Sequence, residues 1–235
     1  EQDRVRLLQT AIDCGADWVD CEWGTDCSPL EFKQAKKILS HHDFNETPLS
    51  LNQTARSMME ENADVYKIVT FAKSVNDNFV LLDLLKEHLA ESKLLSFFCM
   101  GPKGILSRIA GKKFGNHWTY TCVPGLEAAP GQIPIHQMAN LYRADQINPD
   151  TKLFGILGHP IGHSLSPRVH NKVFERYDIN SVYLPVDCEP HEWKEFSNHF
   201  GEFSGFSVTA PLKGLASESA QSHSRDVELT ASANT

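Results

Sequence analysis

Short apolar runs alternate with amphipathic stretches along the first half of the chain. Val5, Leu8 and Ile12 have helical spacing at the beginning. Five strands are predicted by the apolar runs at 17–23, 36–42, 64–71, 94–100 and 117–123, and helices by the segments at 48–61, 75–91 and 102–113. Continuous apolar strands separated by helices favour a parallel sheet with both faces covered, and therefore an α/β fold.

Such a pattern favours a sheet that closes into a (β/α)8 barrel. A complete barrel has eight strands and ~250 residues, so we expect about three βα units before Glu1 and the C-terminal part of a barrel here. A last helix is predicted in IPIHQMANLYRADQ (133–146), and the polar segment INPDTK follows it. We place a domain boundary there, with a first domain at 1–147 and a second at 152–235.

The pattern restarts after this boundary as a second α/β unit. Strands are predicted at 153–158, 181–187 and 203–211, with helices at 166–177 and 189–200. Ser166 is suited to cap the first of these helices, with Pro167 at its first position. The chain has no initial methionine and stops at TASANT with no predicted closing helix, so both ends are expected to be cuts through a longer protein.

Composition narrows the functional classes. The formal charge of -8 over 235 residues argues against a nucleic-acid surface, although local basic groups could bind a small anion. Apolar runs are interrupted by charge well before the ~20 residues that a membrane span requires. The six cysteines include no C-x-x-C pair and no zinc spacing, which favours reduced thiols in an intracellular, soluble protein.

Lys67 is unusual because it interrupts the buried-strand pattern NADVYKIVTF. An amine enclosed by apolar groups loses its charge more easily and can attack a carbonyl carbon to form an imine. A lysine that reaches water from a strand end is the alternative. His42, at the predicted end of the preceding strand, could transfer protons, and the planar guanidinium of Arg108 could bind a carboxylate.

Ordered motifs around these residues resemble type I 3-dehydroquinate dehydratase. They are S-x-H-D-F-x-x-T-P (40–48), D-x-Y-K-I (64–68), M-G-x-x-G-x-x-S-R (100–108), F-G (114–115) and A-P-G-Q (129–132). The resemblance covers residues 1 to about 146 and implies a barrel that uses neither metal nor cofactor.

The resemblance also implies a role for each matched residue. Lys67 would form an imine with 3-dehydroquinate, and His42 would act as general acid and base, giving 3-dehydroshikimate. Arg108 would bind the substrate carboxylate and Gln132 a ring hydroxyl. Ala128 stands where many members have a substrate-contacting serine, and acidic and basic residues of the family's early strands are expected before Glu1.

The second half resembles the substrate-binding domain of shikimate dehydrogenase. G-x-P-x-x-H-S-x-S-P-x-x-H-N (158–171), V-T-x-P-x-K (208–213) and A-N-T (233–235) occur in that order. The resemblance implies that Ser164 and Ser166 bind the carboxylate, that Thr209 and Asn234 hold ring hydroxyls, and that Lys213 assists proton transfer. NADP would be bound by a domain beyond Thr235, since no G-x-G-x-x-G sequence occurs in the chain.

Dehydratase followed by dehydrogenase is the order found in plant-type bifunctional enzymes of the shikimate pathway. This interpretation implies the substrates 3-dehydroquinate, 3-dehydroshikimate and shikimate, no nucleic-acid or membrane partner, and a plastid location if the protein is of plant type. A non-catalytic homologue or a truncated fragment that binds quinate-like or shikimate-like acids is the alternative from another class. A class I aldolase-like barrel would explain Lys67 but not the attached second domain.

Overall fold

The chain folds as an α/β protein in which all paired strands are parallel. The computed structural model describes residues 2–91 and 93–235. The first sheet has the order β1-β2-β3-β4 and is formed by β1 (Trp18–Glu22), β2 (Lys36–Asp43), β3 (Val65–Phe71) and β4 (Leu94–Met100). The helices around it are α1 (Gln2–Asp13), α2 (Leu51–Met59), α3 (Asp77–His88) and α4 (Ile105–Ala110), with 3₁₀ turns at Leu89–Glu91, Pro102–Gly104 and Gly111–Phe114. These elements match the predicted order of strands and helices.

The two faces of this sheet have different chemistry. Alternate residues of a strand point to opposite faces. Leu39, Ile68 and Phe97 are buried on one face, where they join the main hydrophobic core with the helices. The opposite face carries His42 and Lys67, and it is the face on which polar side chains meet.

The predicted fifth strand at 117–123 is wrong in most of its length. Only β5 (Thr121–Cys122) is a strand, and it pairs with β6 (Ile133–Pro134) in a separate two-stranded sheet. The cause lies just before it, because the Asn116 side chain accepts a hydrogen bond from the Phe97 N–H and donates one to the Phe97 carbonyl. The Asn116 side chain therefore bonds to the N–H and carbonyl of Phe97 at the edge of β4, which are groups that a fifth strand would pair with.

The last helix of the first half is shorter than predicted. α5 (Ile135–Asn140) ends well before residue 146. Arg143 has φ 47°, a left-handed conformation that cannot continue an α-helix. Its guanidinium donates to the carbonyls of Ile179 and Ser181 in the second half of the chain. Contact with the second domain thus competes with continuation of the helix.

The second half forms a three-stranded parallel sheet with the order β8-β7-β9. Its elements are β7 (Lys152–Gly158), α6 (Ser166–Arg176), β8 (Ser181–Asp187), α7 (Trp193–Phe196) flanked by 3₁₀ turns at Pro190–Glu192 and Ser197–Glu202, β9 (Phe203–Val208), α8 (Lys213–Ser219) and α9 (Arg225–Thr230). α8 and α9 were not predicted. Ser166 was expected to cap α6, but it is the first helical residue, and Leu165 precedes it without a side-chain cap.

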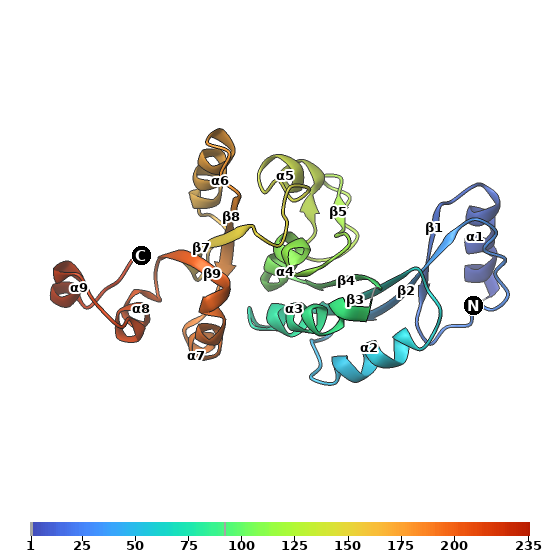
Figure 1. Ribbon diagram of the computed structural model, residues 1–235, viewed down its shortest axis with the longest axis horizontal. Helices are drawn as coiled ribbons and strands as arrows, with labels where there is room; N and C mark the ends of the chain where they lie inside the picture. The colour runs from blue at the N-terminus through green and yellow to red at the C-terminus, as the bar shows by residue number, and fades with distance from the viewer. Residues whose placement is uncertain (1, 92) are drawn as a thin grey trace.

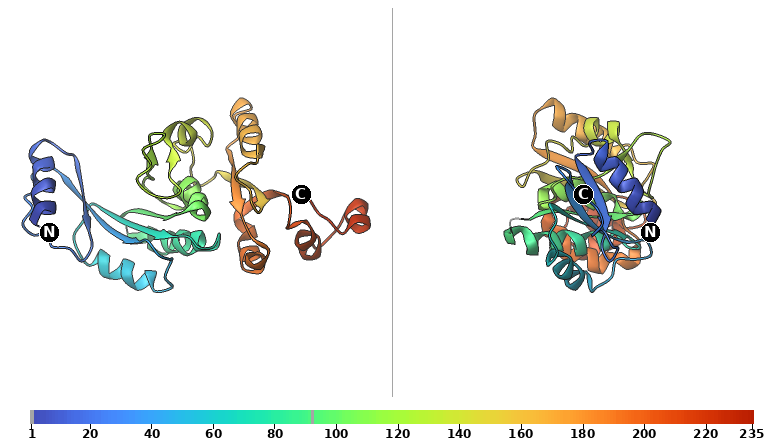
Figure 2. Two further views of the ribbon diagram at one scale, coloured as in Figure 1. Left: turned by 180° about the vertical axis from the view of Figure 1, so that it is seen from behind. Right: turned by 90° about the vertical axis from the view of Figure 1, so that its right-hand side faces the viewer.

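Along the long axis of the molecule, α1 lies at one end, followed by the first sheet and then the second sheet, with α8 and α9 at the other end (Figure 1). The view from behind gives the same order (Figure 2). One hydrophobic core continues from the helices of the first sheet into the second domain and includes Phe79 of α3 and Phe196 of α7. No helix among residues 2–91 and 93–235 has the length and apolar character needed to cross a bilayer.

Candidate functional site

Lys67 lies in the middle of β3, with Ser40 of β2 and Ser96 of β4 as its partners in register. Its side chain is buried, so it is not a lysine that escapes to water from a strand end. Lys67 Nζ donates to Asp20 Oδ2 at 2.8 Å and lies 4.6 Å from the centre of the Tyr120 ring. Its surroundings are therefore more polar than its neighbours in sequence suggest.

His42 and Glu22 form a second pair on the same face. The Nδ1 atom of His42 lies 2.5 Å from Glu22 Oε2, and Glu22 Oε1 accepts the His42 backbone N–H at 2.9 Å. Burial raises the pKa of Glu22, but hydrogen bonds from His42 and Ser40 outweigh burial, and the net pKa is lowered. Glu22 is therefore held as a carboxylate that fixes the imidazole of His42 and favours a proton on Nδ1.

Asp20 and Glu22 are functional candidates that the sequence reasoning missed. Acidic residues of the family's early strands were expected before Glu1, and Asp20 and Glu22 were not predicted. Both carboxylates extend from β1 to the face that carries Lys67 and His42. The alternation in WVDCE contained the signal, because residues two apart on a strand share a face. Two acids on one face of a strand require partners, which are here the lysine and the histidine.

Arg108 is buried without a polar partner for two of its nitrogens. Its exposed fraction is 2%, and Nε and Nη1 have no hydrogen bond among the described residues. Burial lowers the pKa of Arg108 to about 10. The guanidinium stacks over Phe98 at 4.7 Å, while Phe98 also contacts Tyr120, the aromatic neighbour of Lys67. A buried cation of this kind is suited to receive an anion from solution.

A cavity of about 260 Å³ borders Arg108. Trp118 and Thr119 also line it, and the indole N–H and the hydroxyl of these residues have no partner among the described residues. Trp118 packs edge-on against Trp18 of β1, with ring centres 4.9 Å apart. The Trp118 and Tyr120 rings therefore lie over the face of the sheet that carries Lys67, and the unpaired donors of Trp118 and Thr119 lie beside the arginine.

Gln132 belongs to a turn at the end of β4. Gly101 N–H donates to the Pro130 carbonyl, and Gly131 lies so close to Gly101 that a side chain would collide with its carbonyl. The Gln132 Oε1 atom accepts the Ala128 N–H at 2.8 Å. The turn is thus anchored at the end of β4, and the Gln132 side chain bonds to its own loop.

Most of the predicted residues of the second half lie in the segments that follow β7 and β9. The loop after β7 carries Ser164 and Ser166, and Ser164 Oγ accepts the Ser166 N–H at 3.2 Å. Thr209 N–H donates to the Leu157 carbonyl. Crevices at the carboxyl ends of parallel strands are the usual ligand sites of open α/β sheets.

The last described residues of the chain bond to the end of β9 and to the start of α8. Val208 N–H donates to the Asn234 carbonyl at 2.8 Å, and Ala233 N–H donates to the Lys213 carbonyl at 3.0 Å. These bonds bring Asn234 and Lys213 to the end of β9. The nearby His159 pairs with Asp187 at 2.6 Å, whereas His170 stacks on Tyr183. Both histidines thus have structural partners.

Comparison with known proteins identifies the first half. Residues 1–149 match the family model for type I 3-dehydroquinase. The chain belongs to the type I 3-dehydroquinase family. Residues 156–235 of the same chain match the model for the shikimate dehydrogenase substrate binding domain.

Curated relatives include proteins with one or both of these parts. The bifunctional 3-dehydroquinate dehydratase/shikimate dehydrogenase of Arabidopsis thaliana is 33% identical over 227 residues, which are 92% of this chain and 37% of the plant protein. A 3-dehydroquinate dehydratase of Dehalococcoides mccartyi is 38% identical over 151 residues, 61% of this chain and 67% of that protein. This chain thus spans little more than a third of the plant relative.

Solved structures agree with this assignment. The dehydroquinate dehydratase and shikimate dehydrogenase from S. pombe AroM aligns with all of this chain and 46% of its own length, with a TM-score of 0.54 and 27% identity. The 3-dehydroquinate dehydratase from Geobacillus kaustophilus aligns with 62% of this chain and 60% of its own, with a TM-score of 0.54 and 28% identity. The four parallel strands of the first sheet therefore form part of a dehydroquinase barrel.

Proposed function

We propose that the protein catalyses two consecutive steps of the shikimate pathway: dehydration of 3-dehydroquinate to 3-dehydroshikimate, and its NADPH-dependent reduction to shikimate. The observation that carries the first step is a buried lysine on the same sheet face as a histidine held by a carboxylate, with an unpaired buried arginine nearby. Family membership and the two matched family models support the order of the two steps.

Lys67 is the proposed nucleophile of the dehydratase. Its amine must lose a proton before it attacks a ketone, and Asp20 is the base in contact with it at 2.8 Å. Attack on the ketone carbon followed by loss of water gives an imine. Once protonated, the imine withdraws electrons and makes the neighbouring C–H acidic.

His42 is the proposed proton carrier of the same reaction. The imidazole accepts the proton from the acidified carbon, and the electrons of that C–H bond form the new double bond. The protonated imidazole returns a proton to the adjacent hydroxyl, which leaves as water with the electrons of its C–O bond. Water then attacks the imine carbon, releases 3-dehydroshikimate and restores the amine of Lys67. With Nδ1 bonded to Glu22, Nε2 of His42 is the nitrogen available for these transfers.

Arg108 is the proposed site for the substrate carboxylate. Its two unpaired nitrogens and its buried position match a planar carboxylate that arrives with the ligand. Gln132, on the turn beside Gly101, is proposed to bind a ring hydroxyl. To do so its carboxamide would exchange the bond with Ala128 for one with the substrate.

The second half is proposed to bind 3-dehydroshikimate for reduction. Ser164 and Ser166 would bind its carboxylate, Thr209 and Asn234 its hydroxyls, and Lys213 would assist protonation of the oxygen that receives hydride. NADPH supplies that hydride when bound. No G-x-G-x-x-G sequence follows a strand of this chain, so no residue is assigned to the dinucleotide.

Borohydride trapping tests the dehydratase in the full-length protein. Reduction in the presence of 3-dehydroquinate should fix a covalent adduct on the peptide that contains Lys67. Lys93 is a matched control, since it also lies over a tyrosine ring, at 5.0 Å, but bonds to the Met59 carbonyl. Lys67→Met should abolish the adduct and Lys93→Met should retain it. An adduct that survives Lys67→Met would refute the role of Lys67.

A further inference from the structure

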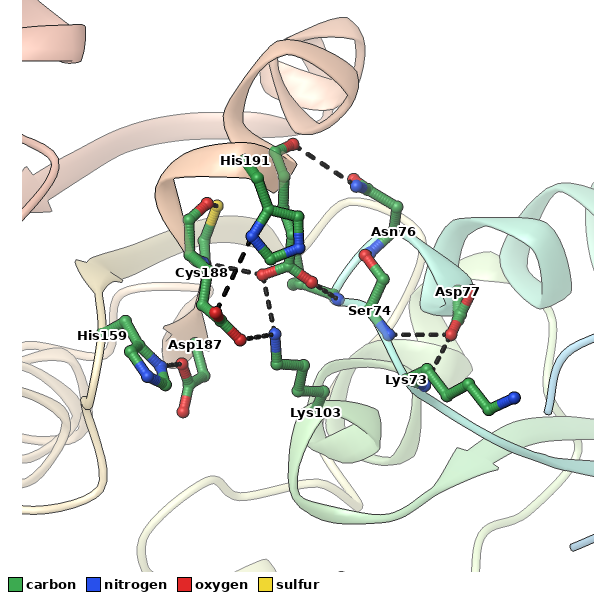
Figure 3. A network of polar contacts seen from close by, with 12 residues as sticks. Lys73, Ser74, Asn76, Asp77, Lys103, His159, Asp187, Cys188 and His191 are labelled. Atoms are coloured by element: carbon green, nitrogen blue, oxygen red, sulfur yellow. Dashed lines mark hydrogen bonds and ion pairs between the residues drawn. The ribbon is translucent and has the colours of Figure 1, made fainter. Parts of the chain in front are cut away.

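Lys103 of the dehydratase half is held by two carboxylates of the second domain. Its Nζ atom lies 2.7 Å from Glu189 Oε1 and 2.8 Å from Glu192 Oε2. Figure 3 shows the polar network around Lys103, with Asn76 and His191 close by. The Glu192 side chain is only 2% exposed. Burial raises the pKa of Glu192, but hydrogen bonds from Glu189, Lys103 and Val75 among others outweigh it, so the net pKa is lowered and the group is a buried carboxylate.

Glu192 also holds the loop that follows β3. Its Oε1 atom accepts the Val75 N–H at 3.1 Å, and its backbone carbonyl accepts from the Asn76 side chain at 3.4 Å. One carboxylate from the second domain thus bonds to the loops that follow two neighbouring strands. β3 carries Lys67, and the loop after β4 leads into the helix with Arg108.

Buried hydrogen bonds continue from these loops to the residue before Arg108. The Asn78 side chain donates to the carbonyls of Lys103 and Val75, and its Oδ1 atom accepts the Ser107 N–H at 3.0 Å. Ser107 Oγ in turn accepts the Cys99 N–H at 2.9 Å and donates to the Gly104 carbonyl at 3.1 Å. Asn78 and Ser107 are both fully buried, so each bond limits the movement of the next.

We propose that Glu192, a residue of the second domain, is a positioning residue for the dehydratase site. It acts through Lys103 and Asn78 on the helix that carries Arg108. The inference rests on the proposed function and adds a role for the second domain in it. Arg108 has no polar partner of its own at Nε or Nη1 among the described residues, so its direction depends on the backbone that carries it. Lys67 differs, because β3 is paired on both sides within the sheet.

This difference predicts a specific kinetic signature. A displaced Arg108 weakens binding of the substrate carboxylate in both ground state and transition state, which raises KM. The imine chemistry at Lys67 should be spared, so kcat should change little. An interface that only joins the domains would show no such separation of KM from kcat.

The test uses the full-length protein with 3-dehydroquinate. Glu192→Gln and Lys103→Met should each raise KM about five- to tenfold and leave kcat within about twofold. The double variant should be no worse than the more affected single variant. Glu202→Gln is the matched control, because it removes another interdomain ion pair, with Lys86 at 2.7 Å, that has no bond to either loop. It should leave KM unchanged.

Glu189→Gln provides a milder variant if Glu192→Gln reduces folding. Glu189 is more exposed, and its replacement removes only one of the two carboxylates on Lys103, so KM should rise about twofold. An unchanged KM in the folded Glu192 and Lys103 variants, or an equal rise in Glu202→Gln, would overturn the inference. A failure of the proposed function can be distinguished from a failure of this inference, because the unmodified protein would then form neither product nor Lys67 adduct.

Discussion

Replacing Arg108 by methionine should stabilise the folded protein while weakening binding of 3-dehydroquinate. Burial lowers the pKa of Arg108 from 12.5 to about 10. A change of one in the pKa corresponds to about 1.4 kcal/mol, so burying the charged guanidinium costs about 3 kcal/mol. Below pH about 10 this cost is constant, since the group is charged in both folded and unfolded protein; it diminishes only as pH rises from about 10.

Methionine has a similar length and no charge, so Arg108→Met should recover part of that cost, about 1–2 kcal/mol in the free energy of unfolding. Urea unfolding at pH 7 measures the gain. The same variant should raise KM for 3-dehydroquinate about 10²-fold, because a charge-assisted pair with the carboxylate is lost.

Arg176→Met is the matched control for Arg108→Met. Arg176 is exposed at the end of α6, so its replacement should change stability by no more than about 0.5 kcal/mol. A loss of about 1 kcal/mol or more in Arg108→Met would show that the guanidinium has a partner in the folded protein. An unchanged KM would show that Arg108 does not bind the substrate carboxylate.

Three further substitutions test separate parts of the structure. Glu22→Gln should lower kcat of dehydration about 10²-fold with little change in KM, because His42 loses its orienting carboxylate; wild-type kcat would contradict this role. His199 stacks on Phe79 at 3.8 Å, and burial lowers the pKa of His199. The contribution of neutral His199 to the free energy of unfolding is therefore complete above pH 6.5 and declines as pH falls below that value. His199→Phe should therefore reduce the loss of melting temperature between pH 7.5 and 5.5, and an equal loss would refute the assignment. Gly131→Ala should destabilise the protein by about 2 kcal/mol in urea unfolding, because φ is +75° and the new methyl group would lie 2.3 Å from the Gly101 carbonyl oxygen; an unchanged midpoint would mean that this turn is not packed as described.

Local patterns predicted the strands that carry Lys67 and His42, because both lie in apolar runs whose burial requires a sheet. The same patterns failed at 117–123. That segment has strand composition, but the Asn116 side chain bonds to the backbone N–H and carbonyl of Phe97, with which a fifth strand would pair. Such competition between a side chain and a strand depends on the folded position of both, and no periodicity records it.

Partners across the sheet were harder to predict than the reactive residues themselves. Lys67 stood out as a charge in an apolar run, whereas Asp20 and Glu22 belong to a strand with ordinary alternation. Their function depends on the register that places β1 beside β2 and β2 beside β3. The Glu192 network joins residues more than a hundred positions apart, and only the packed domains reveal it.

A coupled assay tests most directly whether one chain carries both consecutive steps. Full-length protein is supplied with 3-dehydroquinate and NADPH, and the absorbance of NADPH is followed. We expect NADPH oxidation with 3-dehydroquinate that disappears in Lys67→Met, while that variant still oxidises NADPH with 3-dehydroshikimate. Lys213→Ala should lose oxidation with both substrates. NADPH oxidation from 3-dehydroquinate that persists in Lys67→Met, or none with either substrate in the unmodified protein, would contradict the proposed function.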